Sequence, residues 1–307
     1  MILTVTLNPA IDQTIYIEDF KKGEVNKVDY SVKDPGGKGI NVSRVMKNFE
    51  IQSTAIGFIG GKSGEFIKDF LFKNSINEDF TKVKEDTRTN IKIVDSISGS
   101  TTDINQRGAY ISSDEQIEFL NTYKKMVKES NIVVIAGSVP DGIENIVYKS
   151  LIEIANEAEC KVILDASGDL LKEGIKGKPF MIKPNIHELE ELLSIKLNDK
   201  EDIVKAAREL VDTGIELVCI SMGKEGSILV SREDVYQAKP VEVTVKSTVG
   251  AGDSLVAGFT IGLAQELSVK EAFRLGVATS IIAVSKEGTK AANEKETYEM
   301  VERVEII

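Results

Sequence analysis

A glycine-rich segment near the end of the chain has the composition of an anion-binding turn. The segment runs from Val243 to Phe259, VTVKSTVGAGDSLVAGF, and contains Gly250-Ala251-Gly252. Its β-branched residues predict a strand over 241–245, and a helix is expected from Asp253 onward. Glycines let successive backbone N–H groups converge at a helix N-terminus, where the helix dipole is positive. The segment therefore predicts a phosphate site.

Asp253 is the residue of this segment that indicates a reaction. A carboxylate beside a phosphate would repel it, unless the carboxylate acts on the proton of an attacking hydroxyl. A strand, a Gly-rich turn, a helix and one Asp are therefore typical of phosphoryl transfer with the Asp as base. The residues leave one alternative open, namely that Asp253 only caps the helix.

Two other phosphate-binding motifs are excluded by single positions. Gly61-Lys62-Ser63 ends like a P-loop, but Ile56 stands where the first glycine is required. Gly250-Ala251-Gly252 begins like a dinucleotide fingerprint, but Leu255 takes the place of the third glycine. An NAD-dependent oxidoreductase is therefore disfavoured.

A second glycine-rich segment, Gly36-Gly37-Lys38-Gly39-Ile40-Asn41, also precedes a helical pattern. Its glycines allow a ligand to approach the backbone, while Lys38 and Asn41 supply a cation and a hydrogen-bonding amide. An ordinary loop with a solvated Lys38 explains the same residues. On this segment alone, that simpler interpretation is favoured.

The segment Lys183-Pro184-Asn185-Ile186-His187-Glu188 supports two interpretations. Asn185 and Glu188 fit a helix N-cap paired with a Glu at N3. The same pair suits a Mg²⁺ site bridged by water, because Mg²⁺ keeps its waters and takes few protein carboxylates. His187 is the only histidine of the chain, which excludes a His-based triad and a His-rich zinc site.

Alternating strands and helices must position these segments. Strands are expected at 2–7, 54–59, 132–136, 162–165, 180–182 and 217–221, and helices at 40–49, 65–72, 143–158 and 199–213. This alternation predicts βαβ units and a mostly parallel, doubly wound sheet. A last helix is expected to open with a capping box of Ser268 and Glu271.

Two stretches, 13–33 and 88–111, lack helical periodicity and alternate between polar and apolar residues. The second surrounds Gly99-Ser100, which predicts a hairpin. Both are expected to form a small antiparallel sheet that projects from the main sheet.

Composition limits the class of protein. The 307 residues carry 38 Lys and Arg against 49 Asp and Glu, a net charge of −11, which argues against a nucleic-acid-binding protein. No apolar run approaches the roughly 18 residues of a membrane span, and no signal peptide is recognisable, so a cytoplasmic protein is expected. Cys160 and Cys219 lie in apolar runs and are expected to be buried thiols.

The motifs together resemble those of the ribokinase-like (PfkB) carbohydrate kinases. GGKGINVSRVM at 36–46 and TVGAGDSLVAGF at 248–259 are similar to the two signatures of that family. TLNPAID at 6–12, GSVPDG at 137–142, KPNIHE at 183–188 and SMGKEG at 221–226 follow in the family's order. The resemblance implies one three-layer α/β/α domain over 1–307, with a mostly parallel sheet. It also implies a small β-sheet lid, with strands at about 13–33 and 88–111, through which such kinases commonly dimerise.

The resemblance implies a role for each motif position. Asp253 would take the proton of the sugar hydroxyl, and Gly250, Ala251 and Gly252 would form the anion hole. Lys183, Asn185, Ser221, Gly223, Gly226 and Thr248, with Gly250 and Gly252, would bind ATP, and Asn185 and Glu188 would organise Mg²⁺. The sugar would meet Asp12, Gly37, Lys38, Asn41 and Ser138, and its phosphate would meet Arg88, Lys27 and Lys92.

Within the family, the signatures and TRTNIKI at 87–93 are most similar to kinases that phosphorylate fructose 1-phosphate on its 6-hydroxyl with ATP. Tagatose 6-phosphate is the acceptor of the near relatives. Fructose 6-phosphate, a nucleoside, or a non-catalytic sugar-phosphate- or nucleotide-binding role remain alternatives. Several cations near the acceptor favour a phosphorylated ketohexose over a nucleoside. Ser247-Thr248 stands where many relatives carry Asp-Thr, the Asp being associated with a monovalent-cation site in the ribokinase branch.

Overall fold

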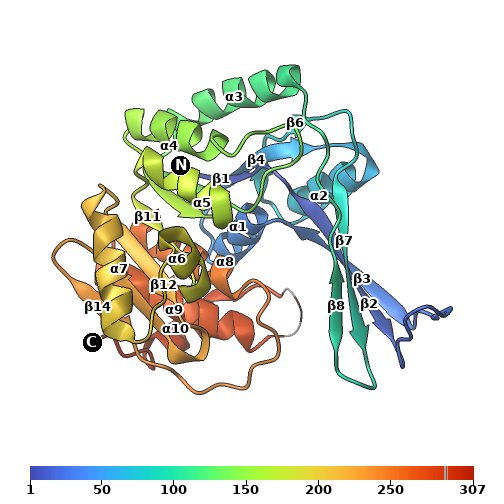
Figure 1. Cartoon of the computed structure of the whole chain (residues 1–307). Helices are drawn as coiled ribbons and strands as arrows, with labels where there is room; N and C mark the ends of the chain where they lie inside the picture. The colour runs from blue at the N-terminus through green and yellow to red at the C-terminus, as the bar shows by residue number, and fades with distance from the viewer. Residues whose placement is uncertain (287, 289) are drawn as a thin grey trace.

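A ten-stranded, mostly parallel sheet forms the centre of the computed structural model, which describes residues 1–286, 288 and 290–307 (Figure 1). The strand order is β14-β13-β12-β11-β10-β9-β1-β4-β5, and β6 also pairs with β4. Only β13 and β14 join this sheet antiparallel. The strands are β1 (Ile2–Thr6), β4 (Thr54–Ile59), β5 (Asn77–Glu78), β6 (Thr81–Lys82), β9 (Ile132–Ala136), β10 (Lys161–Asp165), β11 (Met181–Ile182), β12 (Leu217–Ser221), β13 (Ser227–Val230) and β14 (Val235–Ala238).

Helices cover both faces of this sheet. One face packs against α3 (Ser113–Val127), α4 (Val147–Glu157), α5 (Gly168–Gly174), α6 (Ile186–Leu193) and α7 (Lys200–Asp212). The other packs against α1 (Lys38–Asn48), α8 (Ala251–Ala264), α9 (Val269–Val284) and α10 (Glu294–Val301). Helix α2 (Gly61–Lys73) packs beside α1 against β4. Two short 3₁₀ helices complete the main body, η1 (Ile175–Gly177) and η2 (Gly223–Glu225).

The apolar strands explain the three layers. Side chains of a strand alternate between its two faces, so Val133 enters the core on the α3–α7 side while Val134 enters the core under α1 and α8. In a parallel sheet that is covered on both faces, the side chains that point to either face must be apolar. Each strand is therefore a continuous apolar run. The predicted three-layer α/β/α fold with a mostly parallel sheet is confirmed. Cys160 and Cys219 are buried as expected.

The strand predicted over 241–245 is wrong. Residues 239–248 form no strand or helix, and the alternating side chains of Val241, Val243 and Val245 instead line a cavity. The alternation that resembles a strand therefore reflects burial against a cavity wall rather than pairing in a sheet. The following helix starts at Ala251, so Asp253 lies in its first turn.

The capping box predicted at α9 forms only in half. The Ser268 hydroxyl accepts a hydrogen bond from the Glu271 amide at 3.3 Å. The Glu271 carboxylate turns to Arg274 at 2.9 Å instead of returning to the cap.

A four-stranded sheet projects from the main body (Figure 1). Its order is β3 (Tyr30–Gly36), β2 (Ala10–Ile17), β7 (Arg88–Asp95) and β8 (Thr101–Ile104), and we call it the lid. The prediction of an antiparallel lid is wrong for its central pair, because β2 and β7 run parallel. The chain passes through the main sheet between these two strands, so β7 re-enters the lid in the same direction as β2. The β7–β8 pair is the expected hairpin.

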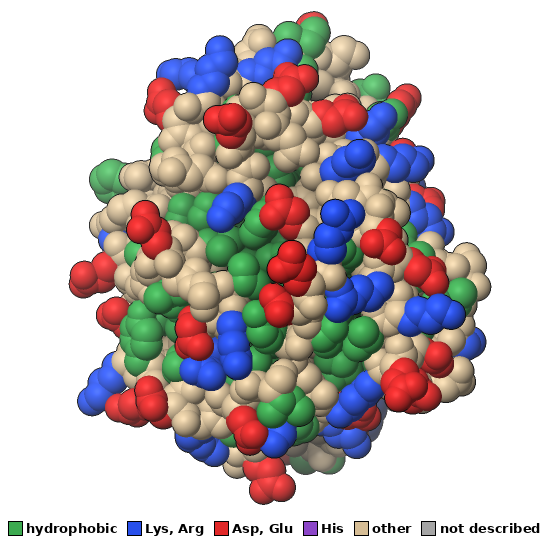
Figure 2. Space-filling view, turned by 90° about the vertical axis from the view of Figure 1, so that its left-hand side faces the viewer, with side chains coloured by type: hydrophobic (Ala, Val, Ile, Leu, Met, Phe, Trp, Pro, Cys, Tyr) green, Lys and Arg blue, Asp and Glu red, His purple; other side chains and the backbone are tan. Residues whose placement is uncertain are grey.

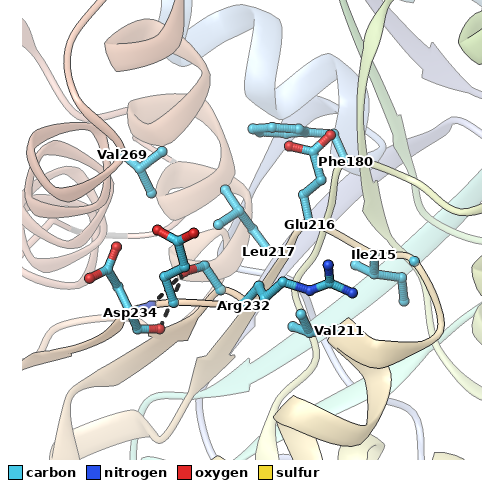
Figure 3. A pocket seen from close by; sticks show the side chains of 11 residues that line it. Phe180, Val211, Ile215, Glu216, Leu217, Arg232, Asp234 and Val269 are labelled. Carbon is cyan, nitrogen blue, oxygen red and sulfur yellow. Dashed lines mark hydrogen bonds between the residues drawn. The ribbon is translucent and has the colours of Figure 1, made fainter.

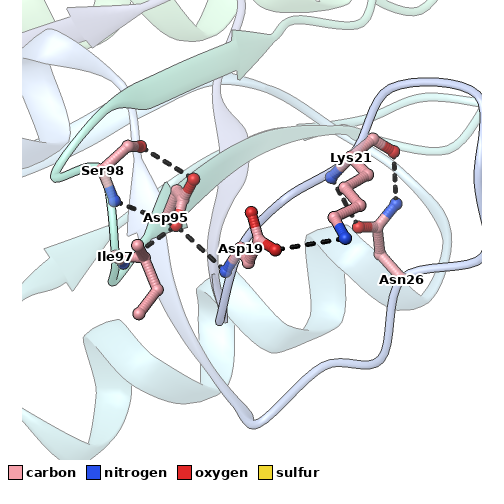
Figure 4. Close-up of polar contacts among 6 residues, drawn as sticks. All are labelled: Asp19, Lys21, Asn26, Asp95, Ile97 and Ser98. Carbon is pink, nitrogen blue, oxygen red and sulfur yellow. Dashed lines mark hydrogen bonds and ion pairs between the residues drawn. The ribbon is translucent and has the colours of Figure 1, made fainter.

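The far end of the lid is tied together by the carboxylate of Asp95 (Figure 4). This carboxylate accepts hydrogen bonds from the amide of Asp19 at 3.2 Å, the amide of Ile97 at 2.9 Å and the hydroxyl of Ser98 at 2.7 Å. Asp19 follows β2, whereas Ile97 and Ser98 lie in the β7–β8 turn. One buried acceptor thus joins the two outer connections of the lid.

On the face shown in Figure 2, Lys and Arg side chains are interspersed with Asp and Glu rather than gathered in a stripe. None of the described helices is long and apolar enough to cross a membrane.

Candidate active site

The predicted site residues converge at the carboxyl edge of the main sheet. Asp165 is the last residue of β10, Lys183 follows β11, and Lys38 opens α1. Asp253 comes from the first turn of α8. Parallel strands end at the same edge, and open α/β sheets bind their ligands there.

Asp253 is buried, with 7% of its surface exposed. Its Oδ2 accepts a hydrogen bond from the Nδ2 of Asn41 at 2.8 Å. Burial and the neighbouring carboxylate of Asp165 raise the pKa of Asp253 to about 6, against the opposing influence of Lys38, Asn41 and Lys183. The carboxylate is thus mainly ionised at neutral pH and a stronger base than an exposed aspartate.

Asp165 is the charged residue that the sequence analysis missed. It is 1% exposed, and its two oxygens pair with two lysines, Oδ2 with the Nζ of Lys38 at 3.1 Å and Oδ1 with the Nζ of Lys183 at 3.4 Å. Burial alone would raise the pKa of Asp165, but the two ammonium groups lower it. Its signal in the sequence is an aspartate at the end of the apolar run KVIL.

The turn that precedes α8 is built to face an anion. Gly250 is the N-cap residue with φ +77°, a left-handed conformation that favours glycine. The first amides of a helix have no partner within the helix and point out of its N-terminus. A Cβ atom on Gly252 would lie 3.1 Å from the Nζ of Lys183, so a cation lies directly beside these amides.

A cavity of about 600 Å³ lies next to this turn. Seven predicted site residues line it: Asn185, Ser221, Gly223, Gly226, Thr248, Ala251 and Gly252. The sequence analysis missed its apolar walls, which consist of Val241, Val243, Val245, Leu255, Val277, Ile281 and Val284. The combination of apolar walls and a polar end suits a ligand with a flat ring at one end and phosphates at the other.

A second group of polar residues lies where the lid joins the main body. Asp12 of β2 and Asn90 of β7 are opposite each other in register, and the Nδ2 of Asn90 donates to the Oδ1 of Asp12 at 2.9 Å. Burial raises the pKa of Asp12, although Asn90 and Arg88 oppose the rise. Arg88, Asn90 and Lys92 alternate along β7 and therefore share one face of the lid.

Arg88 is fixed by backbone carbonyls. Its Nη2 donates to the carbonyl of Asn8 at 3.0 Å and its Nη1 to that of Gln106 at 3.1 Å. The same Asn8 donates through Nδ2 to the hydroxyl of Ser138 at 3.2 Å, which joins the predicted GSVPDG motif to this group. Gly37, with φ +125°, precedes α1 at the same edge.

Lys27 is the predicted site residue that the fold does not bring to this group within one chain. It is exposed in the connection between β2 and β3, at the end of the lid opposite to Arg88. With about 3.3 Å per residue along β2, the separation is roughly 20 Å. Lys92 lies nearer and pairs with Asp103 at 3.5 Å.

Asn185 and Glu188 form the capping box that the sequence allows. The amide of Asn185 donates to the Oε2 of Glu188 at 2.9 Å, and the amide of Glu188 donates to the Oδ1 of Asn185 at 2.9 Å. In the described part of the chain, no three acidic, His or Cys side chains gather as a metal cage. The pair leaves oxygen lone pairs for a hydrated Mg²⁺, which takes few protein ligands, so the residues fit that ion.

Another cavity, of about 410 Å³, does not match these features (Figure 3). Its apolar wall includes Phe180, Val211 and Leu217, and the carboxylates of Glu216 and Asp234 lie at its edge. None of the predicted site residues lines it. Its acidic rim would repel a phosphate, so it is not the candidate active site.

Comparison with known proteins agrees with this geometry. The pfkB family carbohydrate kinases match residues 5–296 of the chain. The 1-phosphofructokinase of Bacillus subtilis (strain 168) is 42% identical over 94% of either chain. A tagatose-6-phosphate kinase of Staphylococcus epidermidis is 34% identical over 100% of this chain and 99% of its own. The crystal structure of phosphofructokinase-2 from Escherichia coli in complex with potassium is 32% identical, covers 98% of both chains and superposes with a TM-score of 0.92.

The hydrogen bond between Asn41 and Asp253 provides a test of this electrostatic arrangement. We expect Asn41→Leu to raise the pKa of Asp253 above its value of about 6, because the substitution removes a donor to the charged form while keeping the site buried. Carbon-13 NMR of the aspartate carboxyl groups measures this value. Asn48→Leu, which removes a hydrogen bond to the carbonyl of Ala292 from the other end of the same helix, is the matched control and should leave it unchanged. A pKa that falls in Asn41→Leu would contradict the arrangement.

Proposed function

The chain belongs to the pfkB family of carbohydrate kinases, and from that premise we propose that it transfers the γ-phosphate of ATP to the 6-hydroxyl of fructose 1-phosphate. The products are fructose 1,6-bisphosphate and ADP. A phosphotransferase with an alcohol acceptor needs a base, an anion site and two adjoining substrate sites. The 42% identity to a 1-phosphofructokinase exceeds the 34% identity to a tagatose-6-phosphate kinase, and this difference favours fructose 1-phosphate as the acceptor.

One observation carries the proposal. Asp253, buried and bonded to Asn41, adjoins the Gly250–Gly252 turn, and that turn adjoins the 600 Å³ cavity. The lid residues Asp12 and Arg88 lie on the acceptor side, because Asp12 sits against Gly36 at the start of the segment that carries Asn41. The base therefore lies between a nucleotide-sized cavity and a cationic sugar-phosphate site.

In this mechanism Asp253 accepts the proton of the acceptor hydroxyl as the new O–P bond forms. The transition state of phosphoryl transfer is loose, so most of the acceleration comes from positioning and charge stabilisation. The amides of the Gly250–Gly252 turn and the adjacent ammonium group of Lys183 would face the transferred phosphoryl group. Asn185 and Glu188 would hold a hydrated Mg²⁺, which supplies charge neutralisation for the ATP phosphates.

The acceptor's existing phosphate is assigned to the basic residues of β7. Two backbone carbonyls hold the guanidinium group of Arg88, so its position is fixed before a ligand binds. Lys92 follows on the same face of the lid. A nucleoside would not need these cations. Tagatose 6-phosphate is the second candidate acceptor, since the 34% identical relative that bears that name spans the whole chain.

We also propose that two copies pair through their lids. Tyr30 and Val32 are 57% and 44% exposed on one face of the lid, and a second lid would cover these apolar side chains. In such a pair, the end of the lid that carries Lys27 would extend toward the second copy. ATP and sugar phosphates are intracellular metabolites, which places the proposed activity in the cytoplasm.

The choice of acceptor is tested by ADP release with fructose 1-phosphate, tagatose 6-phosphate and fructose 6-phosphate, measured side by side with Mg²⁺ and ATP. We expect the highest kcat/KM with fructose 1-phosphate, because the sequence is more similar to the kinase of that name. A higher kcat/KM with either of the others would overturn the acceptor but keep the reaction class. No release with any phosphorylated ketohexose would overturn the reaction class.

The role of Asp253 is tested by Asp253→Asn. Loss of a general base typically lowers kcat by about 10²–10⁴-fold, and we expect a loss in that range. The substitution keeps the shape of the site and leaves the nucleotide cavity intact, so the Kd for ATP should change little. Calorimetric titration with ATP and steady-state kinetics measure the two quantities. Turnover equal to that of the wild type would remove Asp253 from the mechanism.

The role of Arg88 is tested by Arg88→Ala. The contact with the sugar phosphate exists in the ground state and in the transition state, so the KM for the phosphosugar should rise while kcat changes much less. Hydrogen bonds between charged partners are worth about 1.5–3 kcal/mol, which corresponds to roughly a 10- to 150-fold rise. Arg107→Ala, an exposed arginine at the base of the same lid, is the control. A fall in kcat at an unchanged KM would contradict the assignment.

A further inference from the structure

The proposed reaction does not use Asp165, although this side chain is among the most deeply buried charges of the site. It is 1% exposed at the end of β10, and two ammonium groups lie within 3.4 Å of it. A buried carboxylate is unfavourable unless it is paired. The buried charge of Asp165 therefore depends on both lysines. The inference concerns the opposite relation, in which the positions of the two lysines depend on Asp165.

The two lysines belong to different parts of the site. Lys38 opens α1, the helix that presents Asn41 to Asp253. Lys183 follows β11 and lies beside Gly252 in the first turn of α8. Asp165 thus joins the acceptor side of the site to the phosphoryl-donor side, with one carboxylate oxygen for each lysine.

Only a carboxylate can hold both lysines in this way. An amide at position 165 would have one oxygen that accepts and one nitrogen that donates, so it could hold one ammonium group and would oppose the other. The released lysine would then have Asp253 as the nearest carboxylate, because both Lys38 and Lys183 already interact with Asp253 electrostatically. Such a pairing would weaken Asp253 as a base.

We propose that Asp165 is a positioning residue that holds Lys38 and Lys183 together toward the transferred phosphoryl group and away from Asp253. This inference rests on the proposed phosphoryl transfer, in which Lys183 stabilises charge that develops in the transition state, and it extends that role to Lys38. Removing one preorganised donor of that kind typically lowers kcat by about 10²–10³-fold.

The test compares Asp165→Asn with the wild type. We expect kcat to fall by about 10²–10³-fold, while the KM values for ATP and for the phosphosugar change less than about threefold, because the contacts at stake strengthen only in the transition state. Asp169→Asn is the matched control, since it also removes an aspartate that pairs with a lysine, Lys172 at 3.6 Å, but at an exposed position. A lower melting temperature with an unchanged kcat in Asp165→Asn would overturn the proposal.

A second variant separates position from charge. Asp165→Glu keeps the carboxylate but moves it by one methylene, so kcat should fall although the charge remains. Turnover of Asp165→Glu equal to the wild type would overturn the positioning role. This variant also keeps the proposal open to refutation if Asp165→Asn does not fold.

Two further readouts respond to the proposed contacts and not to a general loss of structure. Asp253 is faced by Asp165 from β10, Lys38 and Asn41 from α1, and Lys183 after β11. Asp165 raises the pKa of Asp253. The acid limb of the pH dependence of kcat should therefore move to lower pH in Asp165→Asn. A limb that stays in place or moves to higher pH would count against the proposal.

The last readout needs no turnover. Asp165 raises the pKa of Lys38, so NMR titration of the free protein should show a lower pKa for Lys38 in Asp165→Asn. An unchanged pKa of Lys38 would overturn the ion-pair part of the inference. If the wild type phosphorylates no sugar phosphate, the proposed function fails, and this titration still decides whether Asp165 holds Lys38.

Discussion

Two carboxylates and the ammonium group of Lys183 are buried together at the carboxyl edge of the main sheet, with the half-exposed Lys38 beside them, and none of the buried charges could be buried alone. Asp165 and Asp253 are 1% and 7% exposed, and Lys183 is 5% exposed. Isolated buried charges are costly, and removing one partner of a buried pair typically destabilises a protein by about 3–5 kcal/mol. The four charges balance only if β10, β11, α1 and α8 all end or begin at one place. The fold and the site therefore impose the same requirement on these four elements.

Close packing of α8 and α9 sets the position of the phosphate turn. A Cβ atom on Gly258 of α8 would lie 2.8 Å from the Cα atom of Gly276 on α9, so only glycine allows this approach. These glycines are therefore contact residues between two helices. Because α8 is held along its length, its N-terminus carries Gly250 and Asp253 to a fixed place over the strand ends. The anion site depends on this interhelical contact as much as on its own glycines.

The sequence was sufficient for the buried parallel strands at the centre of the sheet and for the motif residues, because both depend on local patterns. Continuous apolar runs such as 132–136 indicate strands covered on both faces, and the glycines mark the turns where backbone must approach a ligand. It was insufficient where the meaning of a residue depends on distant partners. Asp165 reads as an ordinary strand end until Lys38 and Lys183 lie beside it. The valines of 241–245 alternate like a strand, yet they face a cavity. The parallel pairing of β2 and β7 depends on the path of the chain between them, which local alternation does not encode.

The net charge of −11 has a different meaning once the site is known. The substrates of the proposed reaction are polyanions, and charges farther away than the Debye length of about 8 Å at physiological salt are largely screened. Attraction must therefore come from the near groups, and these are Lys38 and Lys183, the helix amides of α8 and the lid cations. An anion that binds there acts in turn on Asp253, since a like charge nearby disfavours the ionised form of a carboxylate. The pKa of Asp253, about 6 in the free protein, should consequently be higher when the phosphates are bound. A higher pKa makes the ionised carboxylate a stronger base but lowers its ionised fraction at neutral pH, so the cations around the phosphates must limit this rise.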